Sequence, residues 1–449
     1  MERLLIESAL ERVRHALEHN DIDQAVAIIE SLRPADQAEV FSELDEEDQE
    51  ALLPRLSPED SADILEELDE EEAAELARSL PHHTLARIVE EMEPDEAADL
   101  LGDIPPEQAE AVLASLEDPD EVRPLLIHPD DTAGGLMTSE FLALRRRTTV
   151  AEALEAVRRW HPEGHVADHL FVVDRNGVLC GMVTLRQLIL AEPHQRMMDI
   201  MDPEVISVPV GTDQEECARL MDRYDLLVLP VVDEHHRLLG VITVDDLVDV
   251  LQEEVTEDIQ RLGGSQPLGG PYLDTRVTRV ARSRIGWLLL LFVTETLTGT
   301  VLRLFEHELD AVVSLTFFIP LLIGTGGNAG SQTISTIIRA LAVGDIELGD
   351  ALRVLWHELR VGLVLGMAMG AVGYARALAW GTESAVASAV AAALLLIVLW
   401  ANVIGSLLPL LASRLHIDPA IVSGPFMSTL VDATGLLIYL YVAKLILGI

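Results

Sequence analysis

The pattern of hydrophobic and polar positions divides the 449-residue chain into three regions. Up to about residue 128, apolar residues recur every three or four positions in short runs, which is typical of short amphipathic helices. Prolines stand near the expected helix starts, where a missing N–H costs little; they are Pro34, Pro58, Pro81, Pro94 and Pro106. Similar text follows the first two, RPADQAEVFSEL and SPEDSADILEEL. We therefore predict an all-α superhelix of stacked helical pairs over residues 1–130.

The second region contains an internal repeat with β-branched apolar runs. Residues 136–154 align with 200–218, and residues 171–189 align with 229–248. We expect each copy to run helix, strand, turn, strand, helix, with VLCGMVT and LLGVIT as strands of a small sheet covered by helices. This text resembles a tandem pair of CBS domains, at 131–198 and 199–252, which are regulatory α/β modules that commonly bind adenine nucleotides or sense ions.

The CBS resemblance implies a place for a nucleotide. In such modules an acidic residue just after the last strand often holds the ribose. The second copy has Asp245 and Asp246 there, whereas the first has Arg186 and Gln187. ATP binding is therefore plausible at one cleft and doubtful at the other.

The third region contains five long apolar segments. They follow a connecting helix and glycine-rich linker, 245–275, which reads VDDLVDVLQEEVTEDIQ and then GGSQPLGGP. Each segment is long enough to cross a bilayer of ~30 Å, so we predict an α-helical membrane domain over 283–449 with spans near 284–305, 312–342, 354–380, 385–412 and 420–447. The arginines at 276, 279, 282 and 284 place the soluble part in the cytoplasm and the C-terminus outside the cytoplasmic membrane.

Charge is divided as sharply as hydrophobicity. Up to residue 282 lie 65 of the 76 acidic residues and 23 of the 31 Lys and Arg residues, a net charge of −42, while the remainder carries −3. Such a polyanion excludes nucleic acid as a partner and favours cations, although acidic surfaces also serve solubility alone. Cys180 and Cys217 are far apart and suggest neither zinc nor a disulfide. The chain has no P-loop, GxSxG or HExxH motif, so we do not expect an enzyme.

Polar residues inside the second and fifth apolar segments point to an ion pathway. GTGGNAGSQT, residues 324–333, is too polar for a lipid-facing helix. The segment is expected to line a pore or an interface, where its glycines allow either close helix contact or a locally opened backbone. The alternative is simple helix packing, in which Asn328 and Gln332 join neighbouring helices by hydrogen bonds. In the fifth segment, Asp432 shares a helical face with Ser428 and Thr429. Asp418 precedes this segment at its cytoplasmic end.

A carboxylate such as Asp432 costs at least ~2.5–3.5 kcal/mol in hydrocarbon, and no intramembrane lysine obviously pairs with it. It therefore needs a cation, a proton or a symmetry mate. Oxygen ligands without His or Cys favour hard cations, and one carboxylate per chain suits Mg²⁺, which keeps several waters, better than Ca²⁺. A protonating aspartate in a proton-coupled carrier has the same signature.

Several strings together closely resemble the MgtE family of bacterial magnesium channels, and the resemblance spans essentially the whole chain. They are AGGLMT (133–138), VDDLVDVL (244–251), GTGGNAGSQT and SGPFMSTLVDATGLLIYL (423–440). The resemblance implies a homodimer in a lipid bilayer, with one pore on the twofold axis where the second and fifth segments of both chains meet. The implied ion-binding residues of this pore are Asp432, Asp418, Asn328, Gln332, Ser428 and Thr429.

The same resemblance implies regulatory Mg²⁺ sites on the cytosolic part. The matching residues are Asp63, Asp95, Asp99, Gly135, Asp213, Glu215, Asp225, Asp246, Asp249, Glu254, Glu257 and Asp258. Two like charges ~4 Å apart repel by about 4 kcal/mol at an effective dielectric constant near 20, and a divalent ion between them reverses the sign. We thus expect Mg²⁺ to compact the cytosolic domains and close the pore.

Three functions follow as hypotheses. The first is a magnesium-selective channel closed by intracellular Mg²⁺ and opened when Mg²⁺ is low. The second is a proton-coupled carrier of magnesium, cobalt or manganese, in which Asp432 takes up the proton. The third is a membrane-anchored nucleotide sensor without transport. The resemblance favours the first.

Overall fold

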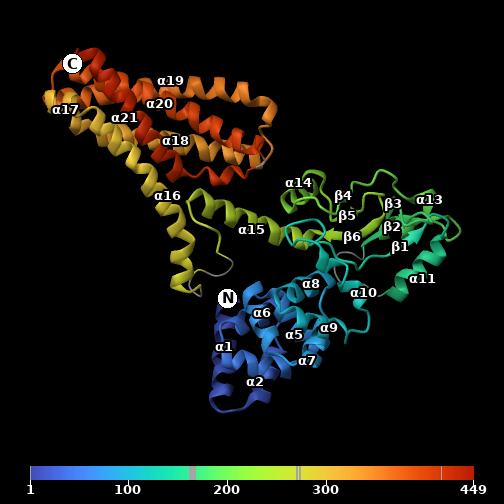
Figure 1. Ribbon diagram of the computed structural model, residues 1–449. Helices are drawn as coiled ribbons and strands as arrows, with labels where there is room; N and C mark the ends of the chain where they lie inside the picture. Colours follow the sequence, from blue (N-terminus) through green and yellow to red (C-terminus); the bar gives the residue numbers. More distant parts are fainter. Residues whose placement is uncertain (1, 161–167, 269–271, 273–274, 416, 449) are drawn as a thin grey trace. The chain divides into compact units, whose positions relative to one another are not determined.

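The chain forms two compact units, residues 1–252 and 253–449, and the division falls inside helix α15 (Val244–Leu262). The computed structural model describes residues 2–160, 168–268, 272, 275–415 and 417–448 (Figure 1). Each unit has its own hydrophobic core. We describe the units separately.

Short helices stack in two layers at the start of the first unit (Figure 1). Alternate helices pack together, α3 with α5 and α7 in one layer and α4 with α6 and α8 in the other, which confirms the predicted superhelix. The helices are α1 (Glu2–Glu18), α2 (Ile22–Ile29), α3 (Pro34–Ser42), α4 (Glu46–Leu52), α5 (Pro58–Glu67), α6 (Glu70–Ser79), α7 (His82–Val89), α8 (Pro94–Asp103), α9 (Pro106–Leu113) and α10 (Pro119–Val122).

The repeat is visible in the hydrogen bonds as well as in the helix starts. Helices α3, α5, α8 and α9 begin at proline, as predicted. Gln37 Nε2 donates to Asp60 Oδ1 at 2.8 Å, and Gln49 Nε2 donates to Glu72 Oε1 at 2.6 Å, each across 23 residues. In each layer, one glutamine side chain thus links a helix to the equivalent helix of the next repeat.

Two small sheets complete the first unit. Their orders are β1-β2-β3 and β4-β5-β6, and in each the first pair is parallel and the second antiparallel. The elements are β1 (Ala143–Arg145), α11 (Val150–Trp160), β2 (His169–Val173), β3 (Leu179–Thr184), α12 (Leu185–Leu190), α13 (Met197–Ile200), β4 (Val208–Pro209), α14 (Gln214–Tyr224), β5 (Val228–Val232) and β6 (Leu238–Thr243). The sequence predicted the long strands β3 and β6 but missed β1 and β4.

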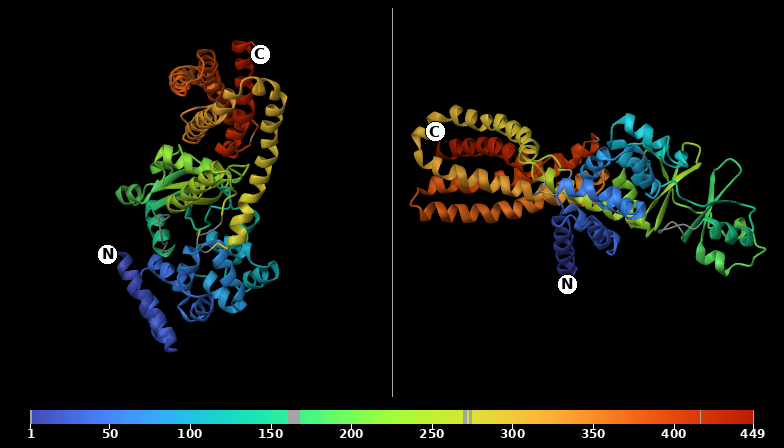
Figure 2. Two further views of the ribbon diagram at one scale, coloured as in Figure 1. Left: turned by 90° about the vertical axis from the view of Figure 1, so that its left-hand side faces the viewer. Right: turned by 90° about the horizontal axis from the view of Figure 1, so that it is seen from below.

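Among its described residues, the second unit contains five helices that are long and apolar enough to cross a membrane, as predicted. Figure 2 shows its long helices running alongside one another. Helix α20 packs against α18, α19 and α21, and α21 also packs against α16 and α18. The helical elements are α16 (Val277–Leu304), α17 (Glu306–Ala311), a 3₁₀ helix (Val313–Phe318), α18 (Ile319–Ala342), α19 (Ala351–Ala379), α20 (Ser384–Arg414) and α21 (Gly424–Leu447).

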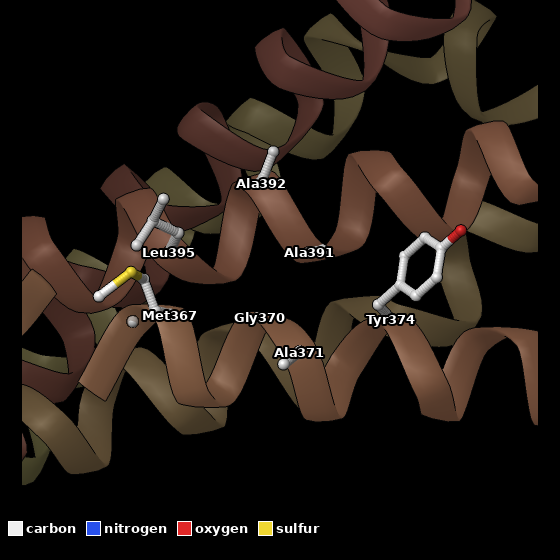
Figure 3. A pocket seen from close by; sticks show the side chains of 8 residues that line it. Met367, Gly370, Ala371, Tyr374, Ala391, Ala392 and Leu395 are labelled. Atoms are coloured by element: carbon white, nitrogen blue, oxygen red, sulfur yellow. The ribbon is translucent and has the colours of Figure 1, made fainter. Parts of the chain in front are cut away.

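Glycines set the closeness of α19 and α20. A Cβ atom on Gly366 would lie 2.8 Å from the Leu395 carbonyl oxygen, and one on Gly370 would lie 2.9 Å from that of Ala391. Figure 3 shows this contact beside an apolar surface pocket, with Met367 and Tyr374 flanking the small residues. In a bilayer, where association gains little from the hydrophobic effect, such close packing holds helices together.

We predict that Gly366→Ala destabilises the membrane domain by about 1–3 kcal/mol, because the added methyl group meets backbone atoms of α20. Gly299→Ala on α16 is the matched control, since its methyl group would meet nothing within 4 Å. The thermal midpoint of the detergent-solubilised protein measures the difference. Equal midpoints for the two variants would contradict this account of the α19–α20 contact.

Candidate ion pathway and carboxylate clusters

Helix α21 begins at a well-capped turn that carries Asp418. Asp418 Oδ1 accepts a hydrogen bond from the Ala420 N–H at 2.7 Å, and the Ser423 hydroxyl accepts one from the Phe426 N–H at 3.4 Å. The helix therefore starts at Gly424, and Asp432 lies about two turns inside it. The local sequence thus determines how deep Asp432 lies along the segment.

Helix α18 is continuous through the glycine-rich segment 324–333. The alternative of an opened backbone is therefore wrong, and the glycines instead allow close contact with α21. A Cβ atom on Gly327 would lie 3.2 Å from Ser428 Oγ, and one on Gly330 would lie 2.6 Å from Met427 Cε. Polar residues of the two helices flank this contact.

We call these residues the polar stripe: Asn328, Gln332, Ser428, Thr429 and Asp432. Asn328 and Gln332 are exposed on the single chain, and the other three are half-buried. Thr429 Oγ1 donates to the Pro425 carbonyl at 3.1 Å, which satisfies the hydroxyl within α21. Exposed amides on an apolar helix require water, an ion or another protein surface in a bilayer.

Asp432 has an acidic neighbour rather than a basic one. Glu295 of α16 lies close enough to interact with it electrostatically, and no basic side chain pairs with Asp432 in the described part of the chain. The sequence analysis missed Glu295, although an acidic residue inside a predicted span was the available signal. Two carboxylates without a base attract a cation or a proton.

A basic side chain does reach Asp418. Arg261, in the last turn of α15, donates to Asp418 and also pairs with Glu257. Burial raises the pKa of Asp258, and the charges of Asp418 and Glu254 raise it further. The predicted ligands Glu254, Glu257, Asp258 and Asp418 are thus brought together near the start of α21, with an arginine among them that the sequence analysis did not consider.

A second group of carboxylates lies where α8 meets the start of α15, within the first unit. We call it the acidic cluster: Glu66, Glu93, Asp95, Glu96, Asp99 and Asp246. Asp95 is 6% exposed, and its Oδ1 has no hydrogen-bond partner within the described part of the chain. Burial and the charge of Asp246 hold the pKa of Asp95 well above its usual value.

The rest of the acidic cluster adds to the same repulsion. Burial and neighbouring carboxylates raise the pKa of Glu93 to about 7 and that of Glu96 to about 8. Glu93 and Glu96 lie at the edge of the acidic cluster with part of each side chain in solvent, whereas Asp95 is buried. A negative charge is therefore most costly on Asp95. Glu66 accepts a hydrogen bond from the Glu93 N–H at 2.7 Å, and Asp63 adds charge beside Glu66.

The acidic cluster has the chemistry of a hard-cation site but not the geometry of a closed one. Its donors are oxygens, and Asp95 Oδ1 is an unsatisfied acceptor. Among the described residues, no three Asp, Glu, His or Cys side chains are arranged to hold a metal ion directly. These residues therefore fit an ion that keeps its water shell, as Mg²⁺ does.

The other predicted regulatory residues lie around α14. Asp213 caps this helix, and its side chain accepts a hydrogen bond from the Glu215 N–H at 3.0 Å. The backbone of Asp213 also forms a β-bridge with Thr132. The Thr132 carbonyl in turn accepts from the Gly135 N–H at 2.9 Å. Asp225 ends the helix in the left-handed conformation (φ 50°). Gly135 thus lies near Asp213 and Glu215, whereas Asp225 is at the opposite end. The side chain of Asp249 is outside the described residues.

Asp246 and Gln187, which stand at predicted nucleotide positions of the two CBS copies, make equivalent hydrogen bonds. Asp246 Oδ2 accepts from the Thr243 N–H at 3.0 Å and from its hydroxyl at 2.7 Å. In the first copy Gln187 Oε1 accepts from Thr184 in the same way, at 2.8 and 2.9 Å. Both side chains cap a helix, and Asp245 is exposed.

Comparison with known proteins matches parts of all three regions of the chain. Residues 319–442 match the family model MgtE, described as a divalent cation transporter, and residues 32–131 match the MgtE intracellular N domain. Residues 133–194 and 197–253 each match the CBS domain. The family models thus follow the order expected from the sequence.

Named relatives and a solved structure agree. The chain is 45% identical over 327 residues to magnesium transporter MgtE of Thermus thermophilus, which covers 73% of this chain and 72% of that protein. It is 33% identical over 322 residues to magnesium transporter MgtE of Bacillus subtilis, covering 72% and 71%. The crystal structure of the cytosolic domain of the Mg²⁺ channel MgtE in complex with ATP matches at 39% identity and a TM-score of 0.51, covering 54% of this chain and 99% of that one.

Both relatives are named as transporters, in agreement with the prediction that the chain is not an enzyme. The family resemblance predicted from the sequence is also confirmed. With matches to the N domain, to both CBS domains and to the membrane domain, and with 45% identity over 73% of its length, this chain belongs to the MgtE family.

Proposed function

We propose that this protein conducts Mg²⁺ across the cytoplasmic membrane and closes when intracellular Mg²⁺ binds its cytosolic carboxylates. The observation that carries the proposal is the polar stripe, in which Asp432 lies inside an apolar helix with no basic partner among the described residues. The names of the relatives support Mg²⁺ as the transported ion. One carboxylate beside hydroxyls and amides suits an ion that passes with part of its water shell.

Two chains complete this pathway. Asn328 and Gln332 are exposed on the single chain, at membrane depth and one turn apart. A second copy facing them would enclose the polar stripe in a water-filled pore on a twofold axis, with one Asp432 from each chain. Two carboxylates then face one hydrated divalent ion, which balances their charge. The homodimer is thus part of the proposal.

The orientation follows from the arginines before α16. Arg276, Arg279, Arg282 and Arg284 favour a cytoplasmic start of the first span, and five spans then leave the C-terminus outside. The acidic cluster would consequently sample intracellular Mg²⁺. Helix α15 carries Asp246 in its first turn, and Arg261 in its last turn contacts Asp418. One helix therefore joins the acidic cluster to the carboxylates around Asp418.

The regulatory step is the neutralisation of repelling carboxylates. Mg²⁺ at the acidic cluster, held by Asp95, Asp246 and their neighbours, removes a repulsion that otherwise opposes contact between α8 and α15. Only the higher affinity of Mg²⁺ for the compact state shifts the equilibrium toward it. Low Mg²⁺ restores the repulsion and favours the open pore.

An adenine nucleotide at the second CBS copy is a further part of the proposal. The related cytosolic domain was solved in complex with ATP. Asp245 is exposed at the end of β6, where the resemblance expects a ribose ligand, while Asp246 is engaged with Thr243. Asp245 is accordingly the available carboxylate.

We predict that Asp432→Ala lowers Mg²⁺ flux into proteoliposomes at least about tenfold, since an ion contact worth ~1.4 kcal/mol or more is lost. Asp345→Ala, which removes an exposed aspartate in the loop after α18, is the matched control and should keep the flux. Wild-type flux should survive collapse of the proton gradient at fixed voltage. Loss of flux on that collapse would instead favour the proton-coupled carrier.

Asp95→Asn tests the regulatory site without a transport assay. Removing its buried charge should raise the thermal midpoint in EDTA, by about 2–4 °C per kcal/mol relieved, and reduce the additional rise that Mg²⁺ produces. Asp23→Asn, at an exposed aspartate of α2, should leave both values unchanged. An unaltered Mg²⁺ response in Asp95→Asn would rule out the acidic cluster as the regulatory site.

A further inference from the structure

A polar group connects three membrane helices away from the polar stripe; Asn402 and Thr333 in it are buried and Glu358 is half-buried. Glu358 lies about two turns into α19, inside a candidate membrane span. Its Oε2 accepts from Asn402 Nδ2 of α20 at 3.1 Å and lies 3.5 Å from the Thr333 hydroxyl of α18. Thr333 lies on the α19–α20 side of α18, whereas Gly327 of the same helix meets Ser428 of α21.

The hydrogen bonds within this group are incomplete. Asn402 is 1% exposed, and its amide oxygen has no hydrogen-bond partner among the residues that the structure describes. A buried amide oxygen without a partner is destabilising, so such an atom calls for a ligand. Since the amide nitrogen contacts Glu358, the unsatisfied oxygen lies beside the carboxylate. A cation there would satisfy both.

The charge of Glu358 is also uncompensated. In the described part of the chain, no basic side chain forms an ion pair with it, and the nearby Arg360 instead donates to the Trp356 carbonyl at 3.2 Å. An isolated carboxylate inside a membrane domain is costly unless a cation or a proton neutralises it. A single negative charge is balanced by a single positive one.

The close packing of α18, α19 and α20 around Glu358 limits the size of a cation that can bind there. A Cβ atom on Gly405 would lie 3.0 Å from the Gly330 carbonyl oxygen, and one on Gly362 would lie 3.2 Å from Asn402 Cβ. The three helices are therefore as close here as small residues allow. A hydrated Mg²⁺, which releases its waters reluctantly, does not suit such a place. A small ion that binds directly to protein oxygens does.

We propose that Glu358, Asn402 and Thr333 bind a dehydrated monovalent cation, with Na⁺ as the fitting ion, at the junction of α18, α19 and α20. The ion binds the carboxylate, the amide oxygen and the hydroxyl, after a rotation of the Asn402 amide where needed. It replaces the missing positive charge and links three helices. This site is independent of the proposed Mg²⁺ pathway.

The full-length protein in detergent, with EDTA at pH 8, tests the proposal through its thermal midpoint. NaCl should raise the midpoint saturably relative to choline chloride at the same ionic strength, and more than KCl does. Glu358→Gln and Asn402→Leu should abolish the Na⁺ response, and Thr333→Val should weaken it. Glu306→Gln, at an exposed glutamate of α17, and Asp432→Asn should retain it.

Two outcomes overturn the proposal. Equal wild-type midpoints in NaCl and choline chloride would mean that Glu358 is neutralised by a proton and serves only to join helices. A Na⁺ response that persists in Glu358→Gln would place the ion elsewhere. The wild-type comparison holds even if Glu358→Gln fails to fold, and Thr333→Val then tests the site with the carboxylate intact.

Discussion

Repulsion between neighbouring carboxylates acts in both units of this protein. The chain has 76 acidic residues against 31 Lys and Arg residues, and Lys444 is its only lysine. Where helices bring acids together, as at the acidic cluster, the pKa values of Asp95, Glu93 and Glu96 rise because burial disfavours each charge and the neighbouring carboxylates oppose it further. A cation is the simplest partner that stabilises such contacts without changing the fold.

The cation that can neutralise a carboxylate differs between the acidic cluster and the interior of the membrane domain. At the acidic cluster, water remains close to the rim, so a hydrated divalent ion is compatible with the site. At the junction of α18, α19 and α20, glycines bring the backbones together around Glu358, and only a small dehydrated ion or a proton fits. Packing density therefore decides which cation a carboxylate can use.

Much of the fold could be predicted because it depends on local signals. Prolines at helix starts and the three- and four-residue spacing defined α3, α5, α8 and α9, and long apolar runs defined the spans. Strands β1 and β4 are three and two residues long, too short to produce a period. Strands β3 and β6 are six residues long, and their apolar, β-branched residues were enough to identify them.

The candidate sites were predictable to a lesser degree. Asp432 could be found because it is a charge in an apolar run. Glu295 and Glu358 carry the same signal, but only tertiary packing relates Glu295 to Asp432 and Glu358 to Asn402. Arg261 could not be assigned at all from the sequence, since its partner Asp418 lies 157 residues away.

Basic residues are scarce in the second unit, and two of the contacts they make hold the ends of α21. Before its start, Arg261 holds Asp418; near its end, Lys444 pairs with Glu308 at 2.5 Å, and the Tyr439 hydroxyl donates to the Leu315 carbonyl at 3.0 Å. Between these points, the glycines of α18 determine how closely the two helices pack. Contacts at both ends therefore hold the helix that carries Asp432, and the contact before its start comes from α15, through Arg261 and Asp418.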